Sequence, residues 1–278
     1  MAAPSAIRWG AGVRDFQIFV LDSNGYPAAT TTAAYLGIDV SGVRDVTIND
    51  PAPRVVTQFG DDRIGGVALL PPTDTLTAEA RVSKLNNTLD AALTGNNIIT
   101  LGEMNVLGVN TDLKGNENQV GIVTYQQAQD SDPASSTFGV LYWEGKILPK
   151  AWMIPRENSL NENATEIIYT VQPTLTKAHL WGTQFTAAAE GYTEAQLVRV
   201  TTVNKPRFVA FKADGSTTTF AYTLTAVSTS KIGVVDNGVV QTSGYTASTT
   251  SVTFSSAPTS GHILVVKLEV ANTSADNA

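Results

Sequence analysis

Residues able to do chemistry are few and widely spaced in this 278-residue chain. There are two histidines, His179 and His262, and no cysteines, which excludes a thiolate metal site and does not indicate a catalytic zinc site. Asp61 and Asp62 are adjacent, and neighbouring side chains of an extended segment point to opposite sides, so they do not pair as an acid and a base. We interpret the segment FGDDRIGG around them as a solvated loop, and both histidines as structural residues.

Catalytic and binding motifs are also missing from the sequence. NTDLKGNEN has only a superficial likeness to a calcium loop, because Lys114 stands where an oxygen ligand belongs and Gly121 where the bidentate glutamate belongs. WGAGVRD supplies G-x-G without a preceding strand or a third glycine, and neither a P-loop nor G-x-S-x-G occurs. The sequence therefore predicts that the protein is not an enzyme, with no catalytic residues, no metal and no cofactor.

The tryptophans allow two interpretations. They could form a platform for binding sugars, or they could anchor cores and interfaces, which is the commoner use of large aromatic side chains. The second interpretation is favoured for the four residues Trp9, Trp143, Trp152 and Trp181.

Composition favours β structure and argues against nucleic-acid binding. Charged residues make up 15% of the chain, against about 25% in an average soluble protein, and much of the polarity comes from residues that suit strands and turns. The formal net charge is −7, and the part from Pro206 onward has four basic and four acidic residues, so the whole excess lies before it. An acidic chain lacks the basic surface that holds a phosphate backbone. The start MAAPSAIRWG lacks a signal pattern and apolar runs such as ILVV are short, so we expect no membrane association.

Turn signals divide the chain into short strands. A strand over 16–21 ends in an Asn-Gly turn, another covers 41–50, and VGIVTYQQ lies between two loop-like segments. TFGVLYWEG and ILPKAWMIP are predicted as two strands with Pro149 and Pro155 at edges or extensions, and ATEIIYTVQP and AQLVRVTTV as two more. The prediction is a mainly β protein.

The clearest pattern lies in TLTAEARVS, where Leu76 begins a period-two alternation of apolar and polar residues that predicts a half-buried strand. NNTLDAALTGNN follows it and predicts a short helix over about 88–94, with Gly95 as its stop. One long helix over 77–94 is the competing interpretation, and the cleaner alternation before Lys84 favours a strand followed by a helix.

The composition changes near Lys205, which predicts a first domain of residues 1–204 and a small all-β domain of residues 205–278. About six strands in the second part predict a small sandwich or barrel. Asp236-Asn237-Gly238 between two pairs of valines predicts a hairpin. The last strand is expected to turn one face inward with Leu264, Val266, Leu268 and Val270.

Residues 207–270 resemble a small β module that recurs in bacteriophage tail and appendage proteins. The likeness rests on GSTTTF at a strand start, the hairpin VVDNGVV, a tyrosine strand, SVTF, an Ala-Pro, a glycine and the closing strand HILVVKLEV. Asn237 stands at the variable hairpin position, and Val270 stands where an aromatic residue is common. The resemblance implies an Ig-like or small-barrel decoration domain.

Residues 1–204 resemble a bacteriophage tail tube protein, also called the major tail protein. The likeness rests on LPPTDTLTAEARV, which enters the alternating strand, on the short helix TLDAALTG, and on the late strands of IIYTVQPTLTKAHLWGTQFT and AEGYTEAQLV around a variable insertion. It implies a β-sandwich with a flanking helix, six copies of which form a ring. The rings would stack into a tube through which DNA passes.

The resemblance also implies partners and sites. The chain would be a structural virion protein, made in the host cytoplasm, that assembles with itself and with tape measure, terminator and baseplate components, and that lets DNA pass without specific binding. Its alternating strand would face the lumen, a neighbouring subunit or simply solvent with Thr77, Glu79, Arg81 and Ser83. A loop over about 108–140 would reach the next ring, with candidate residues Asn110, Asp112, Lys114, Glu117, Asp130 and Asp132.

A phage fibre, baseplate or adhesin-type module that binds a glycan is the alternative. Fibre proteins tend to show repeats or coiled-coil heptads, and this sequence has neither. The tube-like part is also the larger share of the chain.

Overall fold

The structure is a computed structural model. It describes residues 8–31, 33–40, 42–52, 54–60, 63–70, 75–83, 87–96, 98–101, 104–107, 117–130, 133, 134, 136, 138–160, 165–175 and 197–271. Strands make up 58% of it and all sheets are antiparallel, which confirms the prediction of a mainly β protein.

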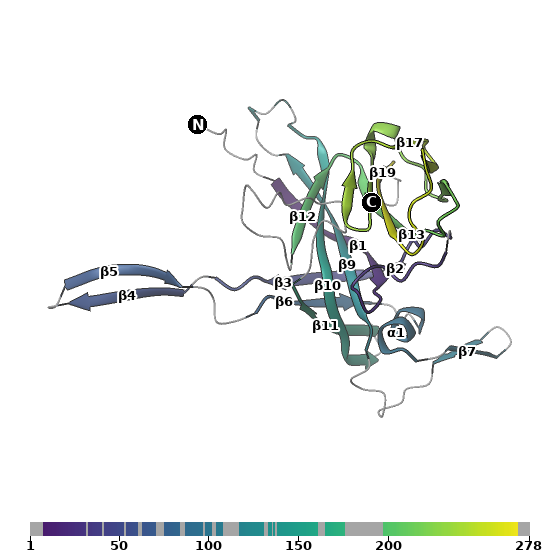
Figure 1. Cartoon of the computed structure of the whole chain (residues 1–278). Coiled ribbons are helices and arrows are strands. Elements are labelled where there is room, and N and C mark those ends of the chain that lie inside the picture. Colours follow the sequence, from purple (N-terminus) through teal and green to yellow (C-terminus); the bar gives the residue numbers. More distant parts are fainter. Residues whose placement is uncertain are drawn as a thin grey trace.

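The largest sheet has the strand order β2-β1-β9-β10-β11-β6-β3, with β12 as a further partner of β10 (Figure 1). Its strands are β1 (Arg8–Val20), β2 (Ile38–Val40), β3 (Val43–Asn49), β6 (Thr77–Val82), β9 (Gln119–Asp130), β10 (Leu141–Leu160), β11 (Thr165–Pro173) and β12 (Val198–Thr202). The strands predicted over 16–21 and 41–50, and those in VGIVTYQQ, ATEIIYTVQP and AQLVRVTTV, are all present.

One prediction is wrong. The segments TFGVLYWEG and ILPKAWMIP were expected to form two strands, but a single strand of 20 residues, β10, runs through both. Its first part pairs with β9 from Leu141 to Trp152, and its last part pairs with β11 from Ala151 to Leu160. Both prolines lie at register shifts of these ladders. Pro149 lies where the pairing with β9 shifts, between Leu148 and Ala151, and Pro155 lies where the pairing with β11 shifts, between Pro155 and Glu157. A proline cannot donate to a ladder, so it interrupts the pairing at an irregular position without ending the strand.

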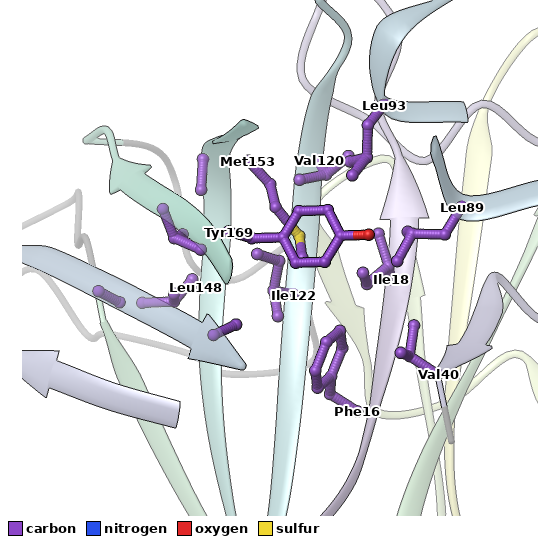
Figure 2. Close-up of a cluster of buried hydrophobic side chains, with 14 of the residues drawn as sticks. Phe16, Ile18, Val40, Leu89, Leu93, Val120, Ile122, Leu148, Met153 and Tyr169 are labelled. Atoms are coloured by element: carbon purple, nitrogen blue, oxygen red, sulfur yellow. The ribbon is translucent and has the colours of Figure 1, made fainter. Parts of the chain in front are cut away.

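The main core is a cluster of buried side chains from β1, β2, β6, β9, β10, β11 and α1 (Figure 2). Phe16 and Ile18 of β1 meet Tyr169 of β11, and Leu89 and Leu93 of the helix close one side of the cluster. A cavity of about 10 Å³ lies in the same core, lined by side chains that include Phe16, Val46 and Met153, and it has room for no more than a single water molecule.

The alternating strand and the helix after it are confirmed. Ala78, Ala80 and Val82 of β6 are buried, and the residues between them are partly exposed. α1 (Asn87–Thr94) follows, and Gly95 has a φ of +72° and donates its N–H to the carbonyl of Ala91, as expected of a glycine that ends a helix. The competing long helix over 77–94 is therefore wrong.

Two hairpins extend from the sheet. β4 (Arg54–Gly60) pairs with β5 (Arg63–Leu70) in a long hairpin that projects far from the rest of the molecule, and β7 (Ile98–Leu101) pairs with β8 (Met104–Leu107) in a short one beyond α1 (Figure 1). The segment FGDDRIGG was expected to be a loop, but its ends belong to β4 and β5. Asp61 and Asp62 lie outside the described residues.

The C-terminal part consists of two facing sheets. The first, in the order β13-β19-β15-β16, has the strands β13 (Lys205–Lys212), β15 (Ile232–Asp236), β16 (Val239–Gln241) and β19 (Ile263–Val270). The second, in the order β14-β18-β17, has β14 (Thr219–Ala221), β17 (Tyr245–Ala247) and β18 (Ser251–Phe254), and a 3-10 turn, Thr229–Lys231, precedes β15. Between the sheets lies a core that includes Phe211, Phe220, Phe254 and the predicted inward residues Leu264, Val266 and Leu268, with Val270 partly buried beside them.

Two turns of this part follow from local chemistry. Asp214 accepts hydrogen bonds from the backbone N–H groups of Thr217 and Ser216, and these bonds hold the pKa of its carboxyl well below the usual range. Asn237 and Gly238 both have positive φ, 45° and 85°, which is the two-residue turn predicted between β15 and β16.

Candidate functional site

The exposed side of β3, β6 and β11 carries the predicted β6 residues. We call it the outer face, and it is opposite to the main core. Cross-strand pairing places Thr47, Glu79 and Thr170 in one row and Asp45, Arg81 and Ile168 in the next. Asn49 and Thr77 form the start of a third row. Ser83 follows β6, and its N–H and hydroxyl both donate to the carbonyl of Gly42.

The charges on β3 and β6 cancel. The Arg81 guanidinium lies 2.8 Å from the Glu79 carboxylate and 3.9 Å from that of Asp45. Arg44 on β3 is a second exposed cation, so the side chains of β3 and β6 contribute two positive and two negative charges. Exposed pairs of this kind contribute about 0–1 kcal/mol to stability.

Together with β10, which pairs with β11, the strands of this face form a four-stranded unit in the order β3-β6-β11-β10. Within the described part of the chain, this unit has two edges. β3 ends the sheet on one side. On the other side β9 stops opposite Trp152, so the last part of β10, from Met153 onward, is paired only with β11. Unpaired strand edges present a row of backbone donors and acceptors that can accept another strand.

The candidate inter-ring loop does not form one continuous loop. Asn110, Asp112, Lys114 and Asp132 lie outside the described residues. Residues 119–130 form β9, at the centre of the sheet, so the expectation of an irregular stretch over 108–140 is wrong there. Glu117 is half-buried just before β9, and Asp130 is buried at its end. The signal was visible in VGIVTYQQ, which the sequence already indicated as a strand.

The C-terminal part covers the side of β1, β9, β10 and β12 that faces away from the main core. Phe19, Val123 and Trp143 of the large sheet share one cluster of buried side chains with Phe208 of β13 and Val265 of β19. The sequence analysis did not predict that this second face of β19 is buried. The continuous apolar runs RFVAF and ILVV are the signal, since strands buried on both faces do not alternate.

Gln17 connects the large sheet to the C-terminal part through hydrogen bonds. It is fully buried in β1, where its amide donates to the carbonyls of Leu36 and Phe208 and its carbonyl accepts the Tyr125 hydroxyl at 2.8 Å. Beside it, Tyr35 exchanges backbone hydrogen bonds of 2.8 and 2.9 Å with Ala210 and thereby covers the edge of β13.

Two buried cations complete this junction. The Lys205 ammonium lies 5.5 Å from the centre of the Tyr125 ring and 5.2 Å from that of Trp143. Arg207 stacks 5.8 Å from the Tyr125 ring and forms an ion pair with Asp39. Such cation–π contacts are stronger when they are removed from water, so they stabilise the docked arrangement.

No family model matches the chain. No curated protein matches it either. The outer face, the open edges, the hairpins and the junction are therefore interpreted from their own geometry.

A hydrogen bond between Tyr169 and Asp90 holds α1 against the main core. The Tyr169 hydroxyl donates to the Asp90 carboxylate at 2.7 Å. Burial raises the pKa of the Asp90 carboxyl, against a smaller lowering by this hydrogen bond. Burial also raises the pKa of Tyr169, and the Asp90 charge adds to that rise. The contact lies among apolar side chains and is suited to positioning the helix.

The remaining candidates for chemistry have structural surroundings. His262 lies 2.8 Å from Asp236, the residue before the turn of the β15–β16 hairpin, whereas His179 lies outside the described residues. Trp143 is fully buried and Trp152 half-buried, which favours anchoring over a sugar platform for these two. Within the described ranges, no group of three or more acidic or histidine side chains is placed to hold a metal ion. No helix of that part of the chain is long and apolar enough to span a membrane.

Proposed function

We propose that this protein is the subunit of a bacteriophage tail tube, a structural protein that joins edge to edge into rings that stack around a channel for DNA. The observation that carries the proposal is the four-stranded unit β3-β6-β11-β10. It has an outer face that is polar on β3 and β6, an apolar inner face on the core and, within the described part of the chain, an edge at each side that no further strand pairs with.

Ring closure by these two edges is stereochemically consistent. Neighbouring strands of the unit alternate in direction, and their number is even, so β3 of one copy would run antiparallel to the last part of β10 of the next. The two edges are of similar length, seven residues in β3 and eight from Met153 to Leu160 in β10. A contact between two different edges propagates from copy to copy and closes into a ring, which removes edges that otherwise promote aggregation. The resemblance to tail tube proteins implies six copies.

The outer face would then line the channel. The hydroxyl and amide groups of β3 and β6, together with the cancelling charges of these two strands, offer DNA no basic surface to bind. The C-terminal part covers β1, β9 and β10 on their side away from the main core, and it would lie on the outside of the tube, in the place of a decoration domain.

The β4–β5 hairpin replaces the stretch 108–140 as our candidate for the long arm that reaches another subunit. It projects clear of the molecule (Figure 1), and Val55 near its base is 59% exposed. A two-stranded hairpin is marginally stable alone in water, so a neighbouring subunit would stabilise it.

Negative-stain electron microscopy of the purified, concentrated protein tests this proposal. Rings or hollow tubes are the expected result. Trimeric rods would contradict it.

A glycan-binding module is the second candidate, and one observation favours it. Thr219, Thr253 and Thr246 form a row across β14, β18 and β17, and none of these strands carries a charged residue. A glycan array is the corresponding test, in which binding abolished by Thr253→Val would support this role.

A further inference from the structure

We propose that the side chains of Lys231 and Asn204 become joined by an amide bond, in a self-modification for which Glu269 acts as the general base and acid. The bond would cross-link the C-terminal part at the point where its first strand begins. This inference goes beyond the proposed function and does not depend on it, because it concerns the covalent structure of a single chain. It rests on an amine and a carboxamide that share one buried carboxylate.

The three side chains come together at one end of β19. Pro206 of β13 pairs with Glu269, and Asn204 lies just before β13. On the other side of β19, Lys231 ends the 3-10 turn before β15, and its N–H donates to the carbonyl of Ser228, which holds the turn in place. The strand order β13-β19-β15 therefore brings the carboxamide and the amine to Glu269 from its two sides.

Each oxygen of the Glu269 carboxylate has one of these groups as its partner. The Asn204 amide donates to Oε2 at 3.2 Å, and the Lys231 ammonium lies 3.6 Å from Oε1. The side chain of Glu269 is 9% exposed and that of Lys231 is 45% exposed, so the lysine reaches from solvent to a buried acid. A carboxylate that contacts both reacting groups is placed to carry protons between them.

The surroundings of Glu269 disfavour a positive charge on nitrogen. Burial lowers the pKa of the Lys267 ammonium in the same strand, and the charge of Lys231 lowers it further, whereas the charge of Glu269 acts in the opposite direction. The shift indicates that lysine side chains are poorly solvated at this end of β19. An amine is a nucleophile only in its uncharged form, so such surroundings favour the reaction.

The reaction balances without an added reagent. The Glu269 carboxylate takes a proton from the Lys231 ammonium, and the free amine attacks Cγ of Asn204. The bond between Cγ and the amide nitrogen of Asn204 then breaks. Two protons in all pass from the lysine nitrogen through Glu269 to the leaving nitrogen, which departs as ammonium. The product is a secondary amide between Nζ of Lys231 and Cγ of Asn204, and Glu269 is again a carboxylate.

The bond would do the work of a disulfide in a chain that has no cysteine. It would join the beginning of β13 to the beginning of β15 across β19, and so close the chain between Asn204 and Lys231 into a covalent loop. A cross-link of this kind stabilises a fold chiefly by restricting the unfolded chain.

Mass spectrometry of the intact wild-type protein tests the inference. The expected mass is that of the sequence less one molecule of ammonia. A tryptic digest should contain the peptide of residues 200–207 joined to the peptide that holds Lys231. The full mass of the sequence would overturn the inference. Loss of one water would overturn it too, because it would indicate a bond to the carboxyl group of Glu269 itself.

Three variants assign the roles. Glu269→Gln and Lys231→Arg should both keep the full mass, since the first lacks the carboxylate and the second carries a guanidinium that does not lose its proton. Lys267→Arg is the matched control, which keeps a positive charge in the same cluster and should still lose ammonia. Loss of ammonia that persists in Lys231→Arg, or a link that forms in Glu269→Gln, would overturn the assignment. Thermal melting verifies that the three variants are folded.

Discussion

Two parts of the large sheet show how differently one sheet can be used. β9, at its centre, is buried on both sides, with Ile122 in the main core and Val123 against the C-terminal part. β6, near its edge, is buried only through alternate residues, and Glu79 and Arg81 reach solvent. The covered part holds the molecule together, and we propose that the half-covered part serves assembly.

The largest expected effect is in the doubly covered part. Trp143→Ala should lower the free energy of unfolding by about 3–5 kcal/mol, because it removes a fully buried side chain from the junction and takes away one ring that faces Lys205. Urea denaturation measures the change. Gln172→Ala, at an exposed position of β11, is the control. Equal losses in the two variants would contradict the distinction between the two parts.

A substitution at Gln17 tests how much its hydrogen bonds stabilise the junction between the large sheet and the C-terminal part. Gln17→Ala should cost about 2–4 kcal/mol, since it leaves the carbonyls of Leu36 and Phe208 and the Tyr125 hydroxyl without their buried partner. Tyr125→Phe removes only one of these bonds and should cost less. If chemical denaturation shows no loss for Gln17→Ala, this role of Gln17 is wrong.

The contact that holds α1 should have a smaller and pH-dependent effect. The pKa of Asp90 is raised on folding, so the folded protein binds this proton more tightly, and the associated stability is lost as pH rises from the unfolded value of 3.8 through the folded pKa. Asp90→Asn carries no such proton. Its stability relative to the wild type should therefore increase across that pH range, as measured by thermal melting at each pH, and a flat difference would contradict the assignment.

The smallest effect on folding is expected on the outer face. Glu79→Gln should change the free energy of unfolding by no more than about 0.5 kcal/mol, because the carboxylate is exposed and only its pairing with Arg81 is weakened. Thr170→Ala in the same row is the companion variant. A loss above about 2 kcal/mol for either, in urea denaturation, would mean that this face is covered within the folded chain.

How much of this was predictable depends on whether a pattern is local. The alternation of β6, the glycine that ends α1 and the Asn237-Gly238 turn each depend on nearby residues, and each was predicted. The inward side of β19 was predicted too.

The rest depends on distant partners. The docking of β13 and β19 on the large sheet joins segments that lie far apart in the chain, such as Gln17 and Phe208, and no local period reveals it. The prolines misled the division of β10, because a proline at a register shift resembles one that ends a strand. Of the candidate site, the sequence indicated the polar residues of β6 but not the open edges beside them, which are properties of the whole sheet.

The most direct test of the ring proposal is a disulfide between its two edges, in a chain that has no cysteine of its own. Thr47→Cys on β3 is combined in turn with Ile154→Cys and Arg156→Cys on β10. Thr47 and Ile154 are three strand spacings apart within one chain, about 14 Å, which is beyond the reach of a disulfide. Oxidation of concentrated protein should yield a ladder of cross-linked oligomers that ends at a closed ring, and single-cysteine variants should stop at dimers. Monomers after oxidation of both combinations would contradict the account.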